Sequence, residues 1–361
     1  MRRTPALIIG GGPAGSAAAI ILGQGGLAPE LIERRTAPYD LVCGGFLGWD
    51  SLAALEQLNL DIFALGARII TYLRLVNGRQ TLEVELPRRA AGFSRRSLDA
   101  ALLSLAVAGG TIAKRGVAVR EVDPATRVAR MNDGEEVTAD ALFLATGKYD
   151  LRGFARPASW TGRGAVGLRT LLKSPLSGNS LDGCIELHLF DGGYAGLLIQ
   201  EDGSTNLCLS VSKERMSVAK SPDALVAMLE DEAPVLGERI GNVNEQQWEA
   251  IAGVPYGWRA QETEHGVYRL GDQAAVISSL AGDGVAIAMQ SGIKAATAFL
   301  RDGASGAAAY QTAFARQARA PVGLAGLLRS AAERPLSRPW LMQLAAIPGL
   351  ASIAARLTRI A

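Results

Sequence analysis

The sequence predicts a two-domain α/β fold in which a parallel-sheet domain is interleaved with a mixed-sheet domain and followed by C-terminal helices. Three stretches carry this prediction. Residues 5–33 run from an apolar segment through a glycine turn and an apolar helix to a second apolar segment, as a βαβ unit does. Residues 184–212 alternate between glycine turns like antiparallel strands, and residues 267–299 repeat the order of strand, glycines and helix.

The individual elements follow from these patterns in chain order. The βαβ unit has its strands at residues 5–9 and 30–33 and its helix at 17–23. Short strands that form a β-meander and a buried strand that ends in small residues are then predicted at 117–120, 127–131, 136–138 and 141–147. Glycine turns divide 184–212 into the strands of a second sheet, and a last strand at 267–270 precedes a helix at 285–299.

Length and composition exclude several classes of protein. The 361 residues suggest two domains, and a 48% hydrophobic content excludes a disordered chain. The 37 basic and 35 acidic side chains nearly balance, which argues against a nucleic-acid-binding protein. Glycine is enriched, at 42 residues, which indicates backbone that approaches a ligand closely.

The cysteines and histidines narrow the chemistry further. Cys43, Cys184 and Cys208 are too few and too far apart for a disulfide framework or a metal knuckle, which favours a reducing compartment. With only His188 and His265, a histidine-rich metal site is excluded, and we expect no metal. His188 is interpreted as a hydrogen-bonded sheet residue.

Two segments bear on membranes. The glycine turn after residue 9 interrupts the N-terminal apolar run, so we do not expect a signal peptide. From residue 319 onward, six arginines and one glutamate give a net charge of +5, mixed with leucines and Trp340, whereas the remaining chain carries −3. This tail is either a helical cap or dimer contact, or a basic amphipathic segment that lies on an anionic membrane.

The glycine turn carries the strongest motif. Gly10-Gly11-Gly12-Pro13-Ala14-Gly15 fits GxGxxG directly after a strand and at the start of a helix. Gly10 permits the turn, Gly12 lets the backbone approach a pyrophosphate, and Gly15 packs the helix on the strand. Glu33 ends the next strand, where an acidic side chain binds the adenosine ribose. The unit therefore predicts a Rossmann-like dinucleotide site.

With three further motifs in the same order, the chain resembles the FAD-dependent oxidoreductases of the p-hydroxybenzoate hydroxylase and geranylgeranyl reductase superfamily. The helix start at 93–102 resembles the family's arginine-bearing segment, residues 145–147 resemble its ATG, and residues 271–275 with 282–284 resemble its GD motif. The resemblance implies a glutathione-reductase-type FAD domain. It implies FAD contacts from Gly10, Gly12, Pro13, Ala14, Gly15, Glu33, Arg34, Cys43, Gly44, Arg95, Thr146, Gly147, Gly271, Asp272, Gly282, Gly284 and Val285.

The resemblance also indicates a substrate side. Cys43-Gly44-Gly45 resembles a reductase-branch motif whose cysteine lies near the flavin, although a small buried side chain is an equal alternative. Tyr194, Tyr256 and Trp258 lie in segments that resemble the lining of the catalytic cavity, with core aromatics as the alternative. We therefore take Cys43 and these three aromatic residues as candidate catalytic residues.

The sequence departs from the family pattern at two places. Ser279 stands where a proline is usual, so the loop beside the flavin is expected to be less rigid. Where hydroxylases carry a DG motif that contacts FAD and NADPH, the chain has Thr146 to Arg152, and Lys148 or Arg152 would have to replace that contact. The electron donor is thus expected to be NAD(P)H or a donor protein.

We expect the FAD domain at residues 1–75, 91–150 and 262–318, the substrate domain at 76–90 and 151–261, and a helical tail at 319–361. The leading hypothesis is a cytoplasmic monooxygenase that hydroxylates an apolar aromatic or polyketide-like small molecule through a flavin hydroperoxide. The alternative is a reductase of prenyl or other carbon–carbon double bonds. A halogenase is disfavoured because WxWxIP is absent, and an FAD-bearing subunit without activity is the non-enzymatic alternative.

Overall fold

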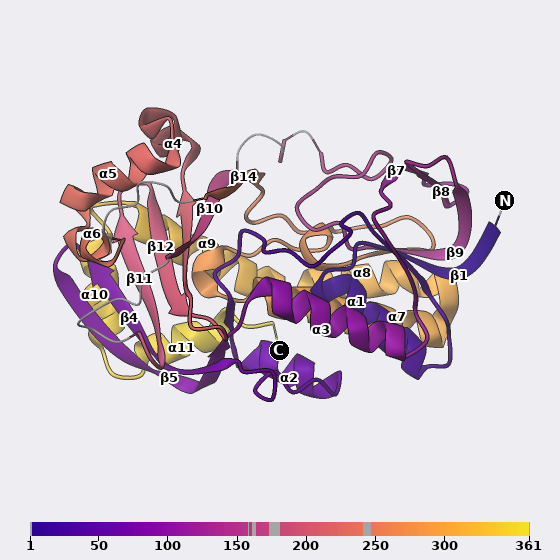
Figure 1. Cartoon of the computed structure of the whole chain (residues 1–361), viewed down its shortest axis with the longest axis horizontal. Coiled ribbons are helices and arrows are strands. Elements are labelled where there is room, and N and C mark those ends of the chain that lie inside the picture. Colours follow the sequence, from indigo (N-terminus) through magenta and orange to yellow (C-terminus); the bar gives the residue numbers. More distant parts are fainter. Residues whose placement is uncertain (1, 158, 161–163, 173–180, 241–246, 361) are drawn as a thin grey trace.

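A computed structural model of the chain describes residues 2–157, 159–160, 164–172, 181–240 and 247–360. Figure 1 shows two sheets arranged along the long axis of the molecule, with helices α1, α3 and α7 beneath the first sheet and the last helices beside the second. The two-domain α/β prediction, with mixed second sheet and C-terminal helices, is confirmed.

The first sheet is the predicted dinucleotide-binding sheet. Its parallel core has the order β6-β2-β1-β9, and β15 pairs in parallel with β9. These strands span Ile112–Arg115, Glu30–Glu33, Arg2–Ile9, Glu136–Leu144 and Val267–Arg269. Antiparallel β8 (Val128–Met131) and β7 (Val119–Asp123) extend it as the predicted meander. The strands predicted separately at 136–138 and 141–147 are one strand, because β9 pairs with β8 near its start and with β1 along its length.

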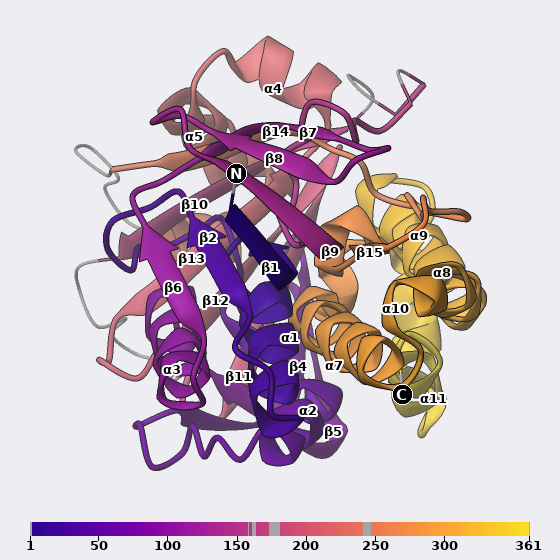
Figure 2. The same ribbon diagram turned by 90° about the vertical axis from the view of Figure 1, so that its right-hand side faces the viewer.

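Small residues bring the helices of this domain close together. Helix α1 (Pro13–Gln24) packs against α7 (Gly284–Asp302) and α3 (Arg95–Ala108), as seen end-on in Figure 2. A Cβ at Gly292 of α7 would lie 2.2 Å from the carbonyl oxygen of Ala14, so only glycine allows this approach. Helices α2 (Trp49–Gln57) and α8 (Gly306–Gln317) complete this domain.

The second sheet has eight strands in the order β14-β10-β13-β12-β11-β4-β5-β3. They span Glu249–Val254, Ala165–Leu172, Thr205–Val211, Gly193–Ile199, Cys184–Phe190, Arg68–Asn77, Gln80–Gly92 and Phe46–Leu47. The strands predicted within 184–212 are present as β11, β12 and β13. The expected boundary after residue 75 falls inside β4, since the whole strand pairs with β11 or β5.

The two faces of the second sheet have different neighbours. One face packs on α4 (Lys213–Ala219), α5 (Pro222–Glu232) and α6 (Pro234–Ile240) through a leucine-rich core. The other face turns towards α9 (Arg319–Glu333) and α10 (Arg338–Ala346), with α11 (Leu350–Leu357) beyond them. Side chains alternate along β11: Ile185, Leu187 and Leu189 face a cavity on the α9 side, whereas Glu186 and His188 face α6.

In the described part of the chain, no single helix is long and apolar enough to cross a membrane. Helices α10 and α11 together have the length and apolarity of a membrane span, but the chain bends by 108° between them.

Candidate functional site

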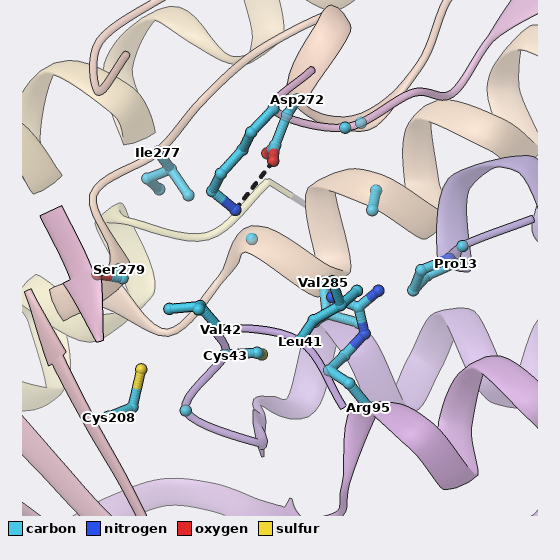
Figure 3. Close-up of a pocket in the computed structure, with 18 of the residues that line it drawn as sticks. Pro13, Leu41, Val42, Cys43, Arg95, Cys208, Asp272, Ile277, Ser279 and Val285 are labelled. Carbon is cyan, nitrogen blue, oxygen red and sulfur yellow. Dashed lines mark ion pairs between the residues drawn. The ribbon is translucent and has the colours of Figure 1, made fainter. Parts of the chain in front are cut away.

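A large cavity lies where the two sheets meet. It has a volume of about 1120 Å³ and reaches from the glycine turn after β1, past the start of α7, to the inner face of the second sheet. Its first part is lined by motif residues, of which Figure 3 shows Pro13, Arg95 and Asp272, and its far part is lined by apolar side chains. A cavity with polar groups at one end and apolar walls at the other suits a cofactor beside an apolar substrate.

The glycines of the turn have two different roles, in protein packing and in ligand binding. Gly10 has a φ of 110°, and a Cβ there would lie 2.3 Å from the Ala145 carbonyl oxygen. A Cβ at Gly15 would lie 1.9 Å from the Gly10 carbonyl oxygen. At Gly12, by contrast, the nearest neighbouring atom would be Arg95 Nη2 at 3.6 Å. Gly10 and Gly15 therefore serve the protein's own packing, whereas Gly12 leaves the cavity open.

The carboxylate of Glu33 stands beside this turn at the end of β2. It accepts hydrogen bonds of 2.8 Å from the backbone N–H groups of Gly11 and Arg35. The neighbouring Arg34 guanidinium stacks on the Tyr149 ring at 4.0 Å and also lines the cavity. This acidic group next to a glycine turn is in the position that an adenosine ribose requires.

Arg95 enters the cavity from the first turn of α3. Ser94 caps this helix by accepting a hydrogen bond from the Ser97 N–H, and Arg95 binds both carboxylate oxygens of Asp99 at 2.9 and 2.8 Å. Burial opposes the charge on Arg95, but Asp99 and the Cys43 thiol outweigh it, so that the pKa of the guanidinium is raised. Arg95 thus offers a fixed positive charge to a phosphate.

Asp272 is held at the end of β15 by a network of buried donors. Arg156 donates to the carbonyl oxygens of Asp272 and Gly147 at 2.8 and 3.0 Å, and Gln273 also donates to Gly147. The Asp272 carboxylate points into the cavity and pairs with Lys148 Nζ at 3.2 Å, the dashed line in Figure 3. Lys148 therefore already has a partner at this point of the site.

The start of α7 also faces the cavity. Gly282 has a φ of 69°, and a Cβ there would lie 2.7 Å from the Phe46 ring. A Cβ at Gly284 would meet nothing within 4 Å, so the first turn of the helix is open to a ligand. The free N–H groups and dipole of this 19-residue helix favour negative charge on a group bound there.

Three hydroxyl groups meet at the apolar end of the cavity. The Ser279 hydroxyl lies 2.5 Å from the Tyr194 hydroxyl and 2.7 Å from the Tyr256 hydroxyl. Burial raises the pKa of both tyrosines, although hydrogen bonds from Ser279 and Ser210 oppose the shift. These phenols are therefore neutral hydrogen-bonding groups. Ser279, the departure from the family proline, contributes the hydroxyl that joins them.

Two thiols face the cavity between this cluster and the motif residues. Cys43 lies in the loop before β3, and Cys208 lies on β13, with its sulfur directed into the space shown in Figure 3. Burial raises the pKa of Cys208 to about 12, so its thiol stays protonated. The sequence pattern alone does not place Cys208 at the site, because only the strand pairing shows which face of β13 it occupies.

The cavity brings together nearly all of the candidate residues. Two of them do not line it. Gly15 packs behind the turn, and Trp258 stands edge-on to Trp160, with ring centroids 5.6 Å apart, while its Nε1 donates to the Gln273 carbonyl oxygen. Arg152 pairs with Glu121 outside the cavity. Trp258 therefore has a packing position rather than a wall position.

The tail contributes lining that the motifs could not reveal. Helices α10 and α11 cover the apolar end of the cavity with their inner sides. The lining residues are Leu341, Leu344, Ala345, Leu350, Ala351, Ala354 and Ala355. The apolar residues of the tail predicted helices. That these helices cover the cavity depends on how the tail folds back over the second sheet.

These features fit FAD. The glycine turn and Arg95 would hold its pyrophosphate, Glu33 its adenosine ribose, Asp272 its ribityl chain, and the start of α7 its ring carbonyls. The fit is carried by Gly12 and Gly284, which leave space that a side chain would fill. In the described residues, no group of three or more His, Cys, Asp and Glu side chains could hold a metal ion.

Comparison with known proteins agrees with this reading. Residues 3–151 match the FAD binding domain family. The menaquinone reductase of Mycolicibacterium smegmatis is 26% identical over 314 residues, which cover 81% of this chain and 76% of that protein. The fold is similar to that of the flavin-dependent brominase Bmp2, with a TM-score of 0.76, 20% identity, and coverage of 99% of this chain and 93% of that one. It is also similar to PqsL, described as a probable FAD-dependent monooxygenase from Pseudomonas aeruginosa, with a TM-score of 0.71, 17% identity, and coverage of 95% and 100%.

Proposed function

We propose that this chain, whose residues 3–151 match the FAD binding domain family, is an FAD-dependent monooxygenase that hydroxylates the aromatic ring of an apolar, chain-bearing phenol. The observation that supports this most directly is the hydroxyl cluster of Tyr194, Ser279 and Tyr256 at the apolar end of the cavity. Reduced FAD supplies the two electrons with which one atom of dioxygen enters the ring and the other leaves as water.

The hydroxyl cluster would bind the oxygen substituent of the substrate ring. Its tyrosines hold their protons, because burial raises the pKa of each, so they act as donors or acceptors of hydrogen bonds and not as acids. Ring hydroxylation suits such a lining, because the ring's own electron density attacks the activated oxygen and its displaced proton leaves afterwards. The cluster's contribution is orientation, which brings the reacting carbon into position.

The remaining walls set the shape of the substrate. Leucines from β4, β11 and α10 surround the space beyond the cluster, and α11 adds alanines. Such a lining excludes water and offers no partner for a charged group. A phenol with a long hydrocarbon substituent satisfies both ends of this cavity. NAD(P)H or a donor protein is the proposed source of electrons.

Reduction of a carbon–carbon double bond is the second candidate. The relationship to menaquinone reductases over about four fifths of the chain supports it. After hydride transfer, this reaction needs an acid that protonates the second carbon. The raised pKa of Cys208 and of the two tyrosines makes these groups poor acids. Cys43, which lines the cavity beside Arg95, is the candidate proton donor.

Two variants separate these candidates. With a long-chain alkylphenol as substrate, Tyr194→Phe should lower kcat/KM about tenfold, the effect of one lost hydrogen bond, while the FAD content is unchanged. Cys43→Ser should leave turnover within about twofold, as expected for a group outside the reaction. Steady-state kinetics with product analysis measures both. If the protein instead leaves the phenol unchanged and reduces a prenyl double bond, and Cys43→Ser loses that activity while Tyr194→Phe keeps it, the reductase is favoured.

A further inference from the structure

A second, smaller pocket lies outside the FAD cavity, where α11 meets the start of α2 and the end of β5. It has a volume of about 250 Å³ and is lined by Trp49, Asp50, Pro87, Arg88, Arg356 and Arg359. We propose that this pocket binds the phosphate of an anionic lipid headgroup, and that α10 and α11 thereby lie on the surface of a membrane. Arg88 and Arg356 lie outside the FAD cavity, whereas Arg359 lines both spaces.

The charges of the pocket favour an anion. Arg359 pairs with Asp283 at 2.9 Å and stacks on the Trp49 ring at 4.4 Å. Among the described residues, the side chains of Arg88 and Arg356 have no ion-pair partner. The single carboxyl group, Asp50, is buried, and burial raises its pKa. Arg359 and Arg88 oppose this shift through their charge, so Asp50 lies in the field of these arginines. Two guanidinium groups without a salt bridge around one small pocket are a typical phosphate-binding arrangement.

Exposed apolar side chains lie on the tail helices, one of which contributes Arg356 to this pocket. Ile353 and Leu357 are 53% and 58% exposed and lie one turn apart on α11, on the side that also carries Arg356. On α10 Trp340 is 67% exposed, and Ile347 lies exposed where the two helices meet. Exposed apolar side chains next to arginines are typical of helices that lie in the interface of an anionic bilayer.

Helices α10 and α11 have one side on the FAD cavity and the other side exposed. Figure 1 shows α10 and α11 in the half of the molecule that holds the second sheet, and both helices contact β5. Their inner residues, such as Leu341 and Ala354, line the apolar end of the cavity, whereas Trp340 and Ile353 face outward. A bilayer, unlike a protein partner, would both cover these side chains and supply an apolar substrate. The lipid site rests on the pocket alone, and only its use in substrate delivery rests on the proposed function.

Vesicle flotation of the full FAD-loaded chain tests the site without any measurement of turnover. We expect binding to vesicles that contain phosphatidylglycerol and at least about tenfold weaker binding to pure phosphatidylcholine vesicles. Arg88→Gln and Arg356→Gln should each weaken binding to the anionic vesicles about fivefold. Arg319→Gln is the matched control, because this exposed arginine of the same tail lines neither pocket, and it should have a smaller effect.

Three results would overturn the proposal. They are equal binding to both kinds of vesicle, no binding to either, or a loss in Arg319→Gln as large as in Arg88→Gln. A fourth arm uses inorganic phosphate: a rise in melting temperature that disappears in Arg88→Gln, without vesicle binding, would assign the pocket to a free phosphate. FAD absorbance and melting temperature show that each variant is folded. Ile353→Gln tests the apolar contribution of α11 separately, since it should weaken vesicle binding while the net charge of the protein is unchanged.

Discussion

Replacement of Gly12 by alanine is expected to yield a folded protein that binds FAD about 10- to 100-fold more weakly, the effect of an overfilled contact. The added Cβ would meet no protein atom closer than 3.6 Å, so the apoprotein should fold as before. The same Cβ projects into the cavity at the point where the backbone must approach a pyrophosphate. The flavin-to-protein absorbance ratio after purification, followed by titration with FAD, measures the loss.

Two controls define this result. Gly323→Ala, on α9, also places a Cβ where nothing lies within 4 Å but outside the cavity, and it should retain full FAD. Gly15→Ala would push a Cβ into the Gly10 carbonyl, and it should lower the melting temperature as well as the FAD content. Stoichiometric FAD in Gly12→Ala would contradict the placement of the cofactor along this turn.

Glu186→Gln is expected to lower the free energy of unfolding by about 3–5 kcal/mol, the usual effect of removing one partner of a buried ion pair. Glu186 is fully buried and binds Arg74 at 2.7 Å, Arg239 at 2.9 Å and the His188 Nε2 at 2.8 Å. Burial lowers the pKa of His188, which keeps its ring neutral, so the two arginines carry the charge that Glu186 balances.

The pH dependence of this pair has a definite sign. Burial opposes ionisation of Glu186, but His188, Arg239 and Arg74 together lower its pKa from 4.5 to about 2. The folded protein therefore gains stability from this carboxylate above pH 4.5, and this gain is lost as the pH falls towards 2. Urea unfolding between these pH values should show a steep loss in the parent protein and a weaker one in Glu186→Gln.

Glu83→Gln is the matched control, because Glu83 also binds Arg74 but is 57% exposed. An exposed pair contributes about 0–1 kcal/mol, so this variant should differ little from the parent. Equal unfolding free energies for the two variants would refute the structural role of Glu186. FAD content should be unchanged in both, because neither side chain lines the cavity.

The sequence indicated the local features of the cofactor side and missed those that depend on long-range packing. Gly10, Gly12 and Glu33 are close in sequence and lie in one βαβ unit, so their spacing alone predicted where they meet. Tyr194 lies on β12 and Tyr256 in the turn after β14, and their meeting at Ser279 depends on how the second sheet packs against the 276–282 segment. No local pattern encodes that packing.

The same limit explains the differences found in the substrate domain. Most of β4 lies within the residues expected for the FAD domain, but the strand pairs with β11, more than 100 residues later in the chain. Trp258 ends the 254–258 segment that resembles a cavity lining, yet Trp160 and the Gln273 carbonyl fix its ring elsewhere. Cys208 was one of several small apolar residues on an alternating strand, and its facing could not be assigned before the register of β13 was known.

The reaction of the reduced protein with oxygen tests the central claim most directly. The purified FAD-loaded protein would be reduced without air and then mixed rapidly with oxygen, with and without a long-chain alkylphenol, while the absorbance spectrum is recorded. A monooxygenase should pass through a transient species that differs from both the reduced and the oxidised spectra, and the phenol should gain one oxygen atom derived from dioxygen. A direct return to the oxidised spectrum, with hydrogen peroxide formed and the phenol unchanged, would contradict hydroxylation and favour double-bond reduction.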